Sequence, residues 1–228
     1  MPLDALDRAL ERELAALEAE GRAKPPERVI VGCTPPAGDK GPRYRLKGSV
    51  QEFIRMNSNS YLSLSHHPEV IRAAEEATCA LGVGPGAVRF IDGTFLQHTV
   101  LEESVARFVG KPAAKSFNAA YTANCGLALA ISTPKTYWIG DQLNHNSIIR
   151  AMRIANVPSE NKAIYSHNDM NHLRNCLEAV PAGMERVVVI FDGIFSMRGD
   201  FAPIDRIEAL ASAFSGKFKE GVVTVVDD

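Results

Sequence analysis

The sequence predicts an α/β fold with a mainly parallel sheet and helices on both of its faces. From about residue 114 onward, short runs of residues typical of strands alternate with longer amphipathic segments, so that five strands and four helices follow one another with short connections. Strands joined through helices in this way pair in parallel through right-handed crossovers. A hydrophobic content of 46% in 228 residues allows a core of the size that such a fold needs.

The first part of the chain has a different character. Leucines recur every three or four residues over the first 17 positions, which predicts an amphipathic helix that ends at Gly21. Residues 25–47 are rich in Pro, Gly and charge, and they predict an arm with one or two short strands. We therefore expect an N-terminal helix and arm at residues 1–58 and a large domain at residues 59–228.

The elements of the large domain follow in a regular order. Helices are expected from about Pro68 and from about His98, on either side of a glycine-rich loop. After them we expect strands at residues 114–120, 135–141, 162–167, 186–194 and 222–226, and helices at residues 123–131, 146–155, 171–180 and 202–214. In such sheets ligands bind beyond the carboxyl ends of the strands, so the residues that follow each strand are the candidates for function.

Composition and charge exclude several classes of partner. The net charge is -2 and the charged residues are scattered along the chain, which argues against nucleic acid and against anionic membranes as partners. The four cysteines form no C-x-x-C pair, the N-terminus lacks the apolar stretch of a signal peptide, and no apolar run approaches the ~20 residues of a membrane span. A cytoplasmic location is expected.

Familiar catalytic motifs fit this sequence poorly. The stretch "GVGPGAVRF" follows a helical pattern and has the wrong spacing for a dinucleotide loop, so a tight loop is the better interpretation. Ser196 lacks the G-x-S-x-G frame, and a hydrolase triad of Ser196, His145 and an aspartate is supported by residue types alone. The spacing of His145, His167 and His172 matches no metal-binding motif, so we expect no metal.

Polar residues nevertheless gather after the expected strands. In the stretch "GDQLNHNSIIRAMR", His145 lies in the loop between a strand and a helix, and Asn146 or Ser147 is expected to cap that helix. The other residues expected at this edge of the sheet are Ala120, Tyr121, Thr122, Asp141, His167, Asn168, Asp169, Asp192, Ser196, Arg198, Asp227 and Asp228.

Seven segments carry a more specific signal. They are "NSYLSLSHHPEVIRAA", "GVGPGAVRFIDGTFLQHTVLEESVARFVG", "AYTANCGLALA", "DQLNHNSIIRAMR", "YSHNDMNHL", "DGIFSMRGDFAPIDRI" and "VVDD". In this order, from about Asn59 to Asp228, the chain resembles the α-oxoamine synthases, pyridoxal phosphate (PLP) enzymes that condense an amino acid with an acyl-CoA and release carbon dioxide. The resemblance implies a type I PLP-dependent, aminotransferase-like fold and a homodimer with its active site at the subunit interface.

The resemblance also implies roles for the residues that match. The backbone amides around Ala120 and Tyr121 would hold the PLP phosphate at the positive end of a helix dipole, and Tyr121 would help to wall the site. His145 would stack on the pyridine ring, Ser196 would lie near the phenolic oxygen of the cofactor, and Asp192 would lie beside the site.

Two further roles follow from the same match. Asp227 would pair with the pyridine nitrogen and keep it protonated, so that the ring can accept electrons from the substrate, and Asn59 would meet the substrate. The identities of the amino acid and of the acyl-CoA stay open.

The sequence departs from the pattern of these enzymes in two ways. Ser63 stands where glycine is usual, and we expect the change to be tolerated. After "VDD" the family continues with a histidine and later with the Schiff-base lysine, and no lysine of this chain lies in that context. We therefore expect the N-terminal part of such an enzyme, inactive by itself. The alternatives are a noncatalytic binding or dimerisation module and, if the match is coincidental, an α/β hydrolase that uses Ser196.

Overall fold

The computed structural model describes residues 3–228. They divide into two compact units, of which the first ends at Thr94 and the second is Phe95–Asp228. The predicted boundary near residue 58 concerns the start of the cofactor-binding domain, and it stays a prediction. No helix within the described residues is both long enough and apolar enough to cross a membrane.

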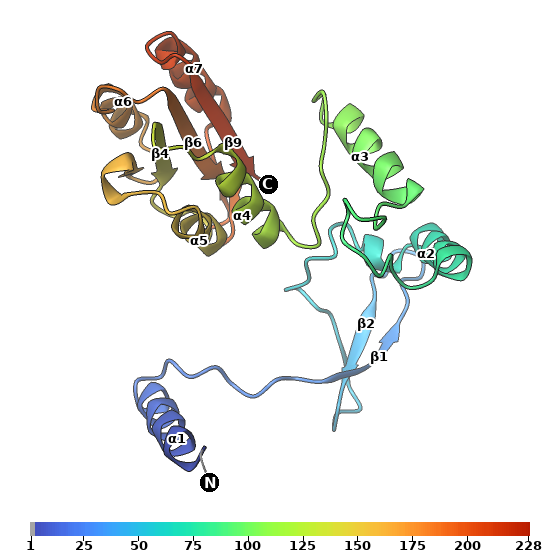
Figure 1. Ribbon diagram of the computed structural model, residues 1–228. Helices are drawn as coiled ribbons and strands as arrows, with labels where there is room; N and C mark the ends of the chain where they lie inside the picture. Colours follow the sequence, from blue (N-terminus) through green and yellow to red (C-terminus); the bar gives the residue numbers. More distant parts are fainter. Residues whose placement is uncertain (1–2) are drawn as a thin grey trace. The chain divides into compact units, whose positions relative to one another are not determined.

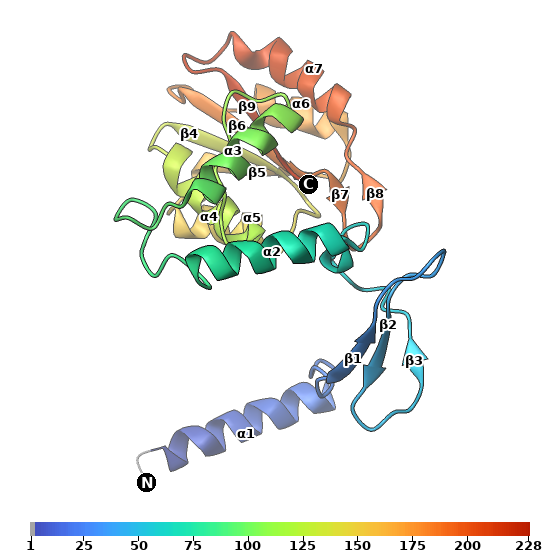
Figure 2. The same cartoon turned by 90° about the vertical axis from the view of Figure 1, so that its right-hand side faces the viewer.

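The first unit combines helices with a small antiparallel sheet (Figure 2). Its elements are α1 (Asp4–Ala19), β1 (Ile30–Thr34), β2 (Arg43–Leu46), β3 (Glu52–Phe53), the 3-10 helix η1 (Leu64–His66) and α2 (Pro68–Leu81). The sheet order is β1-β2-β3, so the predicted arm contains two strands and a third follows it. The predicted first helix is confirmed, and Gly21 follows its end with φ +66, a conformation that glycine adopts without strain.

The residues before η1 adopt a strained backbone conformation. Tyr61, Leu62 and Ser63 have φ values of 36, 51 and 59, in the left-handed region that residues with a Cβ atom rarely occupy. Such a conformation costs roughly 1–2 kcal/mol for a residue with a side chain. The glycine that is usual at position 63 would therefore relieve strain at this site.

Replacing Ser63 with glycine is expected to raise the free energy of unfolding by about 1 kcal/mol, because glycine adopts a positive φ without a steric penalty. Urea denaturation of the whole chain measures the change. Ser60→Gly is the matched control, since Ser60 is not among the residues of positive φ, and it is expected to be neutral or destabilising. Equal effects of the two substitutions would refute the assignment of strain to position 63.

The second unit has a four-stranded parallel sheet with helices on both faces (Figure 1). The main elements are α3 (Leu96–Phe108), α4 (Ala120–Ile131), β4 (Thr136–Asp141), α5 (Asn146–Ile154), β5 (Lys162–Tyr165), α6 (Met170–Glu178), β6 (Arg186–Asp192), α7 (Ile204–Ser215) and β9 (Val222–Asp227). The 3-10 helix η2 (Ser159–Asn161) and a hairpin of β7 (Ile194–Phe195) and β8 (Asp200–Phe201) complete it. The sheet order is β5-β4-β6-β9, which confirms the predicted α/β class.

Alternate residues of the sheet build two cores. Ile139, Val189 and Phe191 face α6 and α7, whereas Trp138 and Val188 face α4 and α5. Each of these side chains is at most 1% exposed, and burying one contributes about 1.5–3 kcal/mol of hydrophobic free energy. Since both faces of the sheet are covered, the central strands β4 and β6 are rigid supports for the residues at their carboxyl ends.

The strand predicted at residues 114–120 does not form. The segment is irregular up to Ala119, and the backbone N–H of Ser116 donates to the carboxylate of Glu102, 2.9 Å away, so it is satisfied by a side chain and not by a neighbouring strand. The ring of Phe117 lies against Gly126 of α4, where an added Cβ would come within 2.9 Å of it. The predicted strand is therefore wrong: Phe117 contacts a helix, and it remains 50% exposed.

Two other boundaries differ from the prediction. The strand expected at residues 186–194 ends at Asp192, and the separate β7–β8 hairpin follows it. The helix expected from Ala123 begins already at Ala120. The glycine-rich stretch at residues 82–90 follows α2 and forms loop and turns, as expected.

Candidate functional site

Three neighbouring strands end in aspartates at one edge of the sheet. Asp141 ends β4, Asp192 ends β6 and Asp227 ends β9, and Asp192 and Asp227 are direct partners in the register of β6 and β9. Asp141 and Asp192 are buried. The carboxyl edge of the parallel sheet thus collects the carboxylates that the sequence placed there, where α/β proteins bind ligands.

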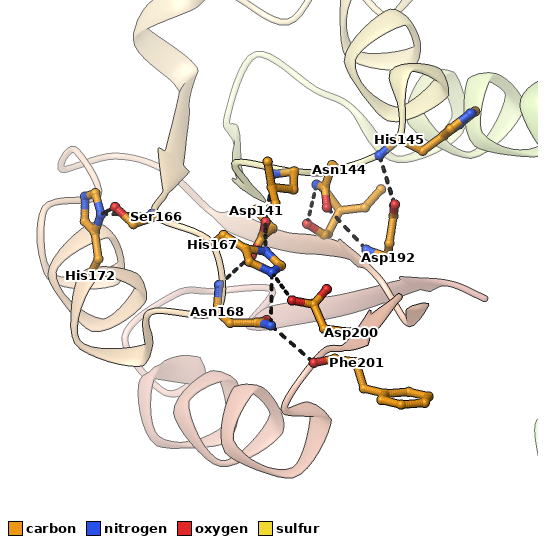
Figure 3. A network of polar contacts seen from close by, with 12 residues as sticks. Asp141, Asn144, His145, Ser166, His167, Asn168, His172, Asp192, Asp200 and Phe201 are labelled. Atoms are coloured by element: carbon orange, nitrogen blue, oxygen red, sulfur yellow. Dashed lines mark hydrogen bonds and ion pairs between the residues drawn. The ribbon is translucent and has the colours of Figure 1, made fainter. Parts of the chain in front are cut away.

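The loop from β4 to α5 is fastened to β6 next to this edge (Figure 3). The side-chain amide of Asn144 donates to the carbonyl of Ile190 at 2.9 Å and accepts from the N–H of Asp192 at 3.2 Å. The backbone N–H of His145 donates to both carboxylate oxygens of Asp192, each 3.1 Å away. The backbone of His145 is therefore fixed, while the residue itself stays exposed.

Burial raises the pKa of Asp192 above its ordinary value, and the nearby carboxylates of Asp227 and Asp141 act in the same direction. The hydrogen bond from the N–H of His145 opposes this shift. A carboxyl group in such a setting takes up a proton more readily than one in water.

A buried amide links α4, α5 and β9. Nδ2 of Asn124 donates to Oδ2 of Asp227 at 2.8 Å and to Oγ of Ser147 at 2.9 Å. Oγ of Ser147 lies 2.7 Å from Nδ1 of His145, and the same nitrogen accepts from the N–H of Ser147 at 3.2 Å. His145 is thus the N-cap of α5, because its ring nitrogen accepts from the second N–H of the first turn. The prediction that Asn146 or Ser147 caps this helix is wrong.

The first turn of α4 offers backbone donors. Ala120 and Tyr121 lie in this turn, not at the end of a strand, and the N-cap residue Ala119 has no side-chain acceptor for the N–H groups that follow it. The first intrahelical hydrogen bond runs from the N–H of Ala123 to the carbonyl of Ala119. The N–H groups of Ala120 and Tyr121 therefore remain available at the positive end of the helix dipole.

Ser196 and Asn59 are not joined to this network. Ser196 is exposed in the turn between β7 and β8 and makes no hydrogen bond to any residue that the structure describes. The ring of His145 contacts Ser147, so the geometry gives the triad with Ser196 no support. Asn59 is exposed and belongs to the unit Met1–Thr94, and its role in binding substrate stays a prediction.

A second polar cluster holds the β7–β8 hairpin to the sheet (Figure 3). Nδ1 of His167 lies 2.9 Å from Oδ1 of Asp141, and Nε2 of His167 lies 3.0 Å from Oδ2 of Asp200 in β8. The side-chain amide of Asn168 donates to the carbonyl of Phe201 at 3.2 Å. These contacts fix the strand that follows the turn with Ser196.

The pKa values of His167 and Asp200 shift in opposite directions. Burial of the ring disfavours the charged form of His167, but the hydrogen bonds with Asp200 and Asp141 outweigh it and raise the pKa of His167 above 6.5. The hydrogen bond from His167 lowers the pKa of Asp200 below 3.8. The ion pair of His167 and Asp200 therefore stabilises the fold most between pH 3.8 and pH 6.5. The contribution of Asp200 is lost as the pH falls through its lowered pKa, and the contribution of His167 is lost as the pH rises through its raised pKa.

Replacing His167 with glutamine is expected to remove a part of the pH dependence of stability. Relative to the variant, the natural protein should lose unfolding free energy as the pH rises from about 6 to about 8, because only its folded state keeps the proton of His167. Denaturant titrations at several pH values measure this difference. His172→Gln is the control, because the partner of His172 is the backbone and hydroxyl of Ser166 and not a carboxylate. If the difference in unfolding free energy between the natural protein and His167→Gln were constant over this range, the ion pair of His167 with Asp141 and Asp200 would be contradicted.

Two residues of the network were absent from the predicted site. Asn124 lies in the apolar stretch "TANCGLALA", and a single amide in an otherwise apolar helix is the signal that could have indicated it. For Ser147 the sequence predicts only a possible role as a helix cap. No group of three or more His, Cys, Asp or Glu residues in the described part of the chain is arranged to hold a metal ion.

Comparison with known proteins shows which family the chain resembles. Residues 51–228 match the family model "Aminotransferase class I and II". The 8-amino-7-oxononanoate synthase of Geobacter sulfurreducens is 39% identical over 192 residues, which are 84% of this chain and 46% of the relative. The mitochondrial 2-amino-3-ketobutyrate coenzyme A ligase of Homo sapiens is 38% identical over 205 residues, 90% of this chain and 46% of the relative. The chain therefore spans about half the length of these relatives.

Solved structures share the fold. A serine palmitoyltransferase from S. paucimobilis, solved with a bound PLP-myriocin aldimine, has a TM-score of 0.78 and 25% identity, covering 98% of this chain and 52% of the relative. A serine palmitoyltransferase from Sphingomonas wittichii has a TM-score of 0.80 at 24% identity. The chain has the type I PLP-dependent, aminotransferase-like α/β fold, and it belongs to the α-oxoamine synthases within the family of class I and II aminotransferases.

Proposed function

We propose that this chain carries the PLP-binding part of an enzyme that condenses an amino acid with an acyl-CoA and releases carbon dioxide. One observation carries the proposal: Asp227 lies at the carboxyl edge of the sheet, with one carboxylate oxygen held by the buried amide of Asn124. A carboxylate at this place can receive a positively charged ring nitrogen. A serine palmitoyltransferase that shares this fold was solved with a bound PLP-myriocin aldimine, which supports PLP as the cofactor.

The residues present fit the chemistry of PLP. The cofactor carries a phosphate, an aromatic ring and a ring nitrogen that can hold a proton. The first turn of α4 offers N–H donors for an anion, Asp227 offers a carboxylate, and the exposed His145 offers an aromatic face. Anion donors, an acceptor for a cation and an aromatic ring thus belong to one unit of the structure.

Each residue then has a defined task. PLP supplies an electron sink for the substrate when it is bound. Asp227 holds the proton at the ring nitrogen, and the amides of Ala120 and Tyr121 bind the phosphate. His145 packs against the ring, with its backbone fixed by Asp192. Ser196 donates to the phenolic oxygen of the cofactor.

The remaining parts of the proposal concern substrates and assembly. We infer that Asn59 contacts the amino acid or the acyl-CoA. We also infer a homodimer, and the exposed leucines of α1, including Leu6 and Leu10, offer an apolar face that a second copy could cover.

Binding of 4′-deoxypyridoxine 5′-phosphate, measured by titration calorimetry, tests the cofactor site. This analogue lacks the aldehyde, so its affinity reports the contacts of ring and phosphate without a covalent bond to lysine. We expect one molecule of the analogue to bind per chain. The analogue without phosphate should bind at least about tenfold more weakly, because hydrogen bonds to a charged group contribute about 1.5–3 kcal/mol.

Equal affinity for the two analogues, or no binding of either, would contradict the proposed cofactor site. A chain that binds the phosphorylated analogue should also be tested with PLP, an amino acid and an acyl-CoA, with the release of free CoA thiol as the measure of condensation. No thiol release by a complete enzyme that contains this chain, over a panel of amino acids and acyl-CoA esters, would refute the proposed reaction.

A further inference from the structure

The side chain of Asn124 is a buried junction between three elements. It lies on α4 and is 8% exposed, and both hydrogen atoms of its Nδ2 group are used, one by Asp227 on β9 and one by Ser147 on α5. A carboxylate can only accept hydrogen bonds, so the amide nitrogen and not the amide oxygen must face Asp227. The orientation of Asn124 follows from this chemistry.

This contact distinguishes the two oxygens of Asp227. Oδ2 accepts from Asn124 at 2.8 Å, whereas Oδ1 makes no hydrogen bond to any of the residues described by the structure. A carboxylate with one oxygen tethered cannot rotate freely about its terminal bond. The free Oδ1 is therefore presented in a fixed direction for a ligand.

The other arm of the junction reaches His145. Oγ of Ser147 accepts from Asn124, and the hydroxyl proton of Ser147 can then be donated to Nδ1 of His145, 2.7 Å away. Nδ1 also receives the backbone N–H of Ser147. With two donors directed at Nδ1, the hydrogen of a neutral ring lies on Nε2, so the same amide influences the ring orientation and the tautomer of His145.

We propose that Asn124 is the positioning residue of the cofactor site: its amide directs Oδ1 of Asp227 toward the protonated ring nitrogen and, through Ser147, holds the imidazole of His145. This inference rests on the proposed PLP-binding function and adds a role for a residue that touches neither ring nor phosphate. Asn124 acts by fixing the carboxylate, so its removal should affect ligands that have a ring nitrogen more than ligands that lack it.

Two ligands separate this role from a purely structural one. One is 4′-deoxypyridoxine 5′-phosphate, and the other is its benzene analogue, in which the ring nitrogen is replaced by C–H. For Asn124→Ala we expect the affinity for the pyridine ligand to fall about tenfold and that for the benzene ligand to change less than about twofold, because only the first uses the charged hydrogen bond to Asp227. Calorimetry at several pH values measures both constants.

The matched control is Thr224→Val on the same strand. Oγ1 of Thr224 donates to Glu208 of α7, on the face of the sheet opposite to Asn124. This variant loses a side-chain hydrogen bond of β9 but should bind both ligands as the natural protein does.

A second variant keeps the shape of the junction in case Asn124→Ala does not fold. Asn124→Asp removes the donor at neutral pH, and its new carboxyl regains one when it is protonated. We therefore expect weak binding of the pyridine ligand at neutral pH and, relative to the natural protein, recovery as the pH falls.

The outcomes are distinct. Equal losses for the two ligands in Asn124→Ala, or no loss for either, would overturn the positioning role while the proposed cofactor site stands. If Asn124→Ala does not fold, the absence of recovery at low pH in Asn124→Asp would overturn it. Failure of the natural protein to bind the phosphorylated pyridine would overturn the proposed function and this inference with it.

Discussion

Replacing Asp227 with asparagine is expected to weaken the binding of 4′-deoxypyridoxine 5′-phosphate by about tenfold to a hundredfold. The substitution keeps the size of the side chain and an oxygen that can accept from Asn124. It removes the negative charge that we propose to face the ring nitrogen. A hydrogen bond between charged groups contributes about 1.5–3 kcal/mol, which corresponds to this range of affinities. The ultraviolet spectrum of the bound ligand, recorded over a range of pH, should also show that the ring proton is lost at a lower pH in the variant than in the natural protein.

Asp228→Asn is the matched control for this experiment. It changes the net charge by the same amount at the adjacent residue, which lies one position beyond the end of β9 and outside the network of Asn124. We expect less than about a twofold effect, because Asp228 is exposed to water of high dielectric constant and is not proposed to contact the ring nitrogen. If the two substitutions weakened binding equally, the effect of Asp227 would be one of net charge, and the proposed contact with the ring nitrogen would be refuted.

Replacing Asn144 with alanine is expected to lower the free energy of unfolding by about 2–4 kcal/mol. The amide of Asn144 satisfies the carbonyl of Ile190 and the N–H of Asp192, two backbone groups of the central strand β6. Alanine leaves both without this partner, and an unsatisfied buried group costs about 1–3 kcal/mol. The loop should also move away from β6, so the affinity for the phosphorylated analogue should fall together with the stability.

Asn146→Ala tests whether this cost is specific. Asn146 is exposed two residues further along, and its side chain accepts a hydrogen bond from Arg150 at 3.4 Å. We expect a change within about 0.5 kcal/mol, as is usual for surface substitutions. Urea denaturation measures both variants, and similar values for the two would show that the contacts of Asn144 with β6 do not anchor the loop.

The sheet could be predicted because parallel strands are covered on both faces. The runs that became β4, β6 and β9 are continuously apolar or β-branched, and each ends in an aspartate, so their identity and their shared carboxyl edge followed from the sequence. The predicted strand at residues 114–120 has no such continuous apolar pattern, because Lys115, Ser116 and Asn118 interrupt it. It does not form because a short run of residues does not specify its pairing partner, and the N–H of Ser116 bonds to Glu102, a residue 14 positions away.

The candidate site was predicted at the level of residue positions but not of contacts. His145, Asp192 and Asp227 belong to one network, yet two of the links between them pass through Asn124 and Ser147, on helices whose packing brings them together. No periodicity in the sequence shows which residue of α4 faces β9. The roles of Ser196 and Asn59 rest on the resemblance alone, since neither makes a hydrogen bond to that network.

A crystal structure of the protein with 4′-deoxypyridoxine 5′-phosphate bound tests the proposed site most directly. We predict that the ring nitrogen lies within hydrogen-bonding distance of Oδ1 of Asp227, that the phosphate lies at the first turn of α4, and that the imidazole of His145 packs against the ring. A ligand bound with its nitrogen away from Asp227, or with its phosphate away from Ala120 and Tyr121, would contradict the assignment of this edge of the sheet as the cofactor site.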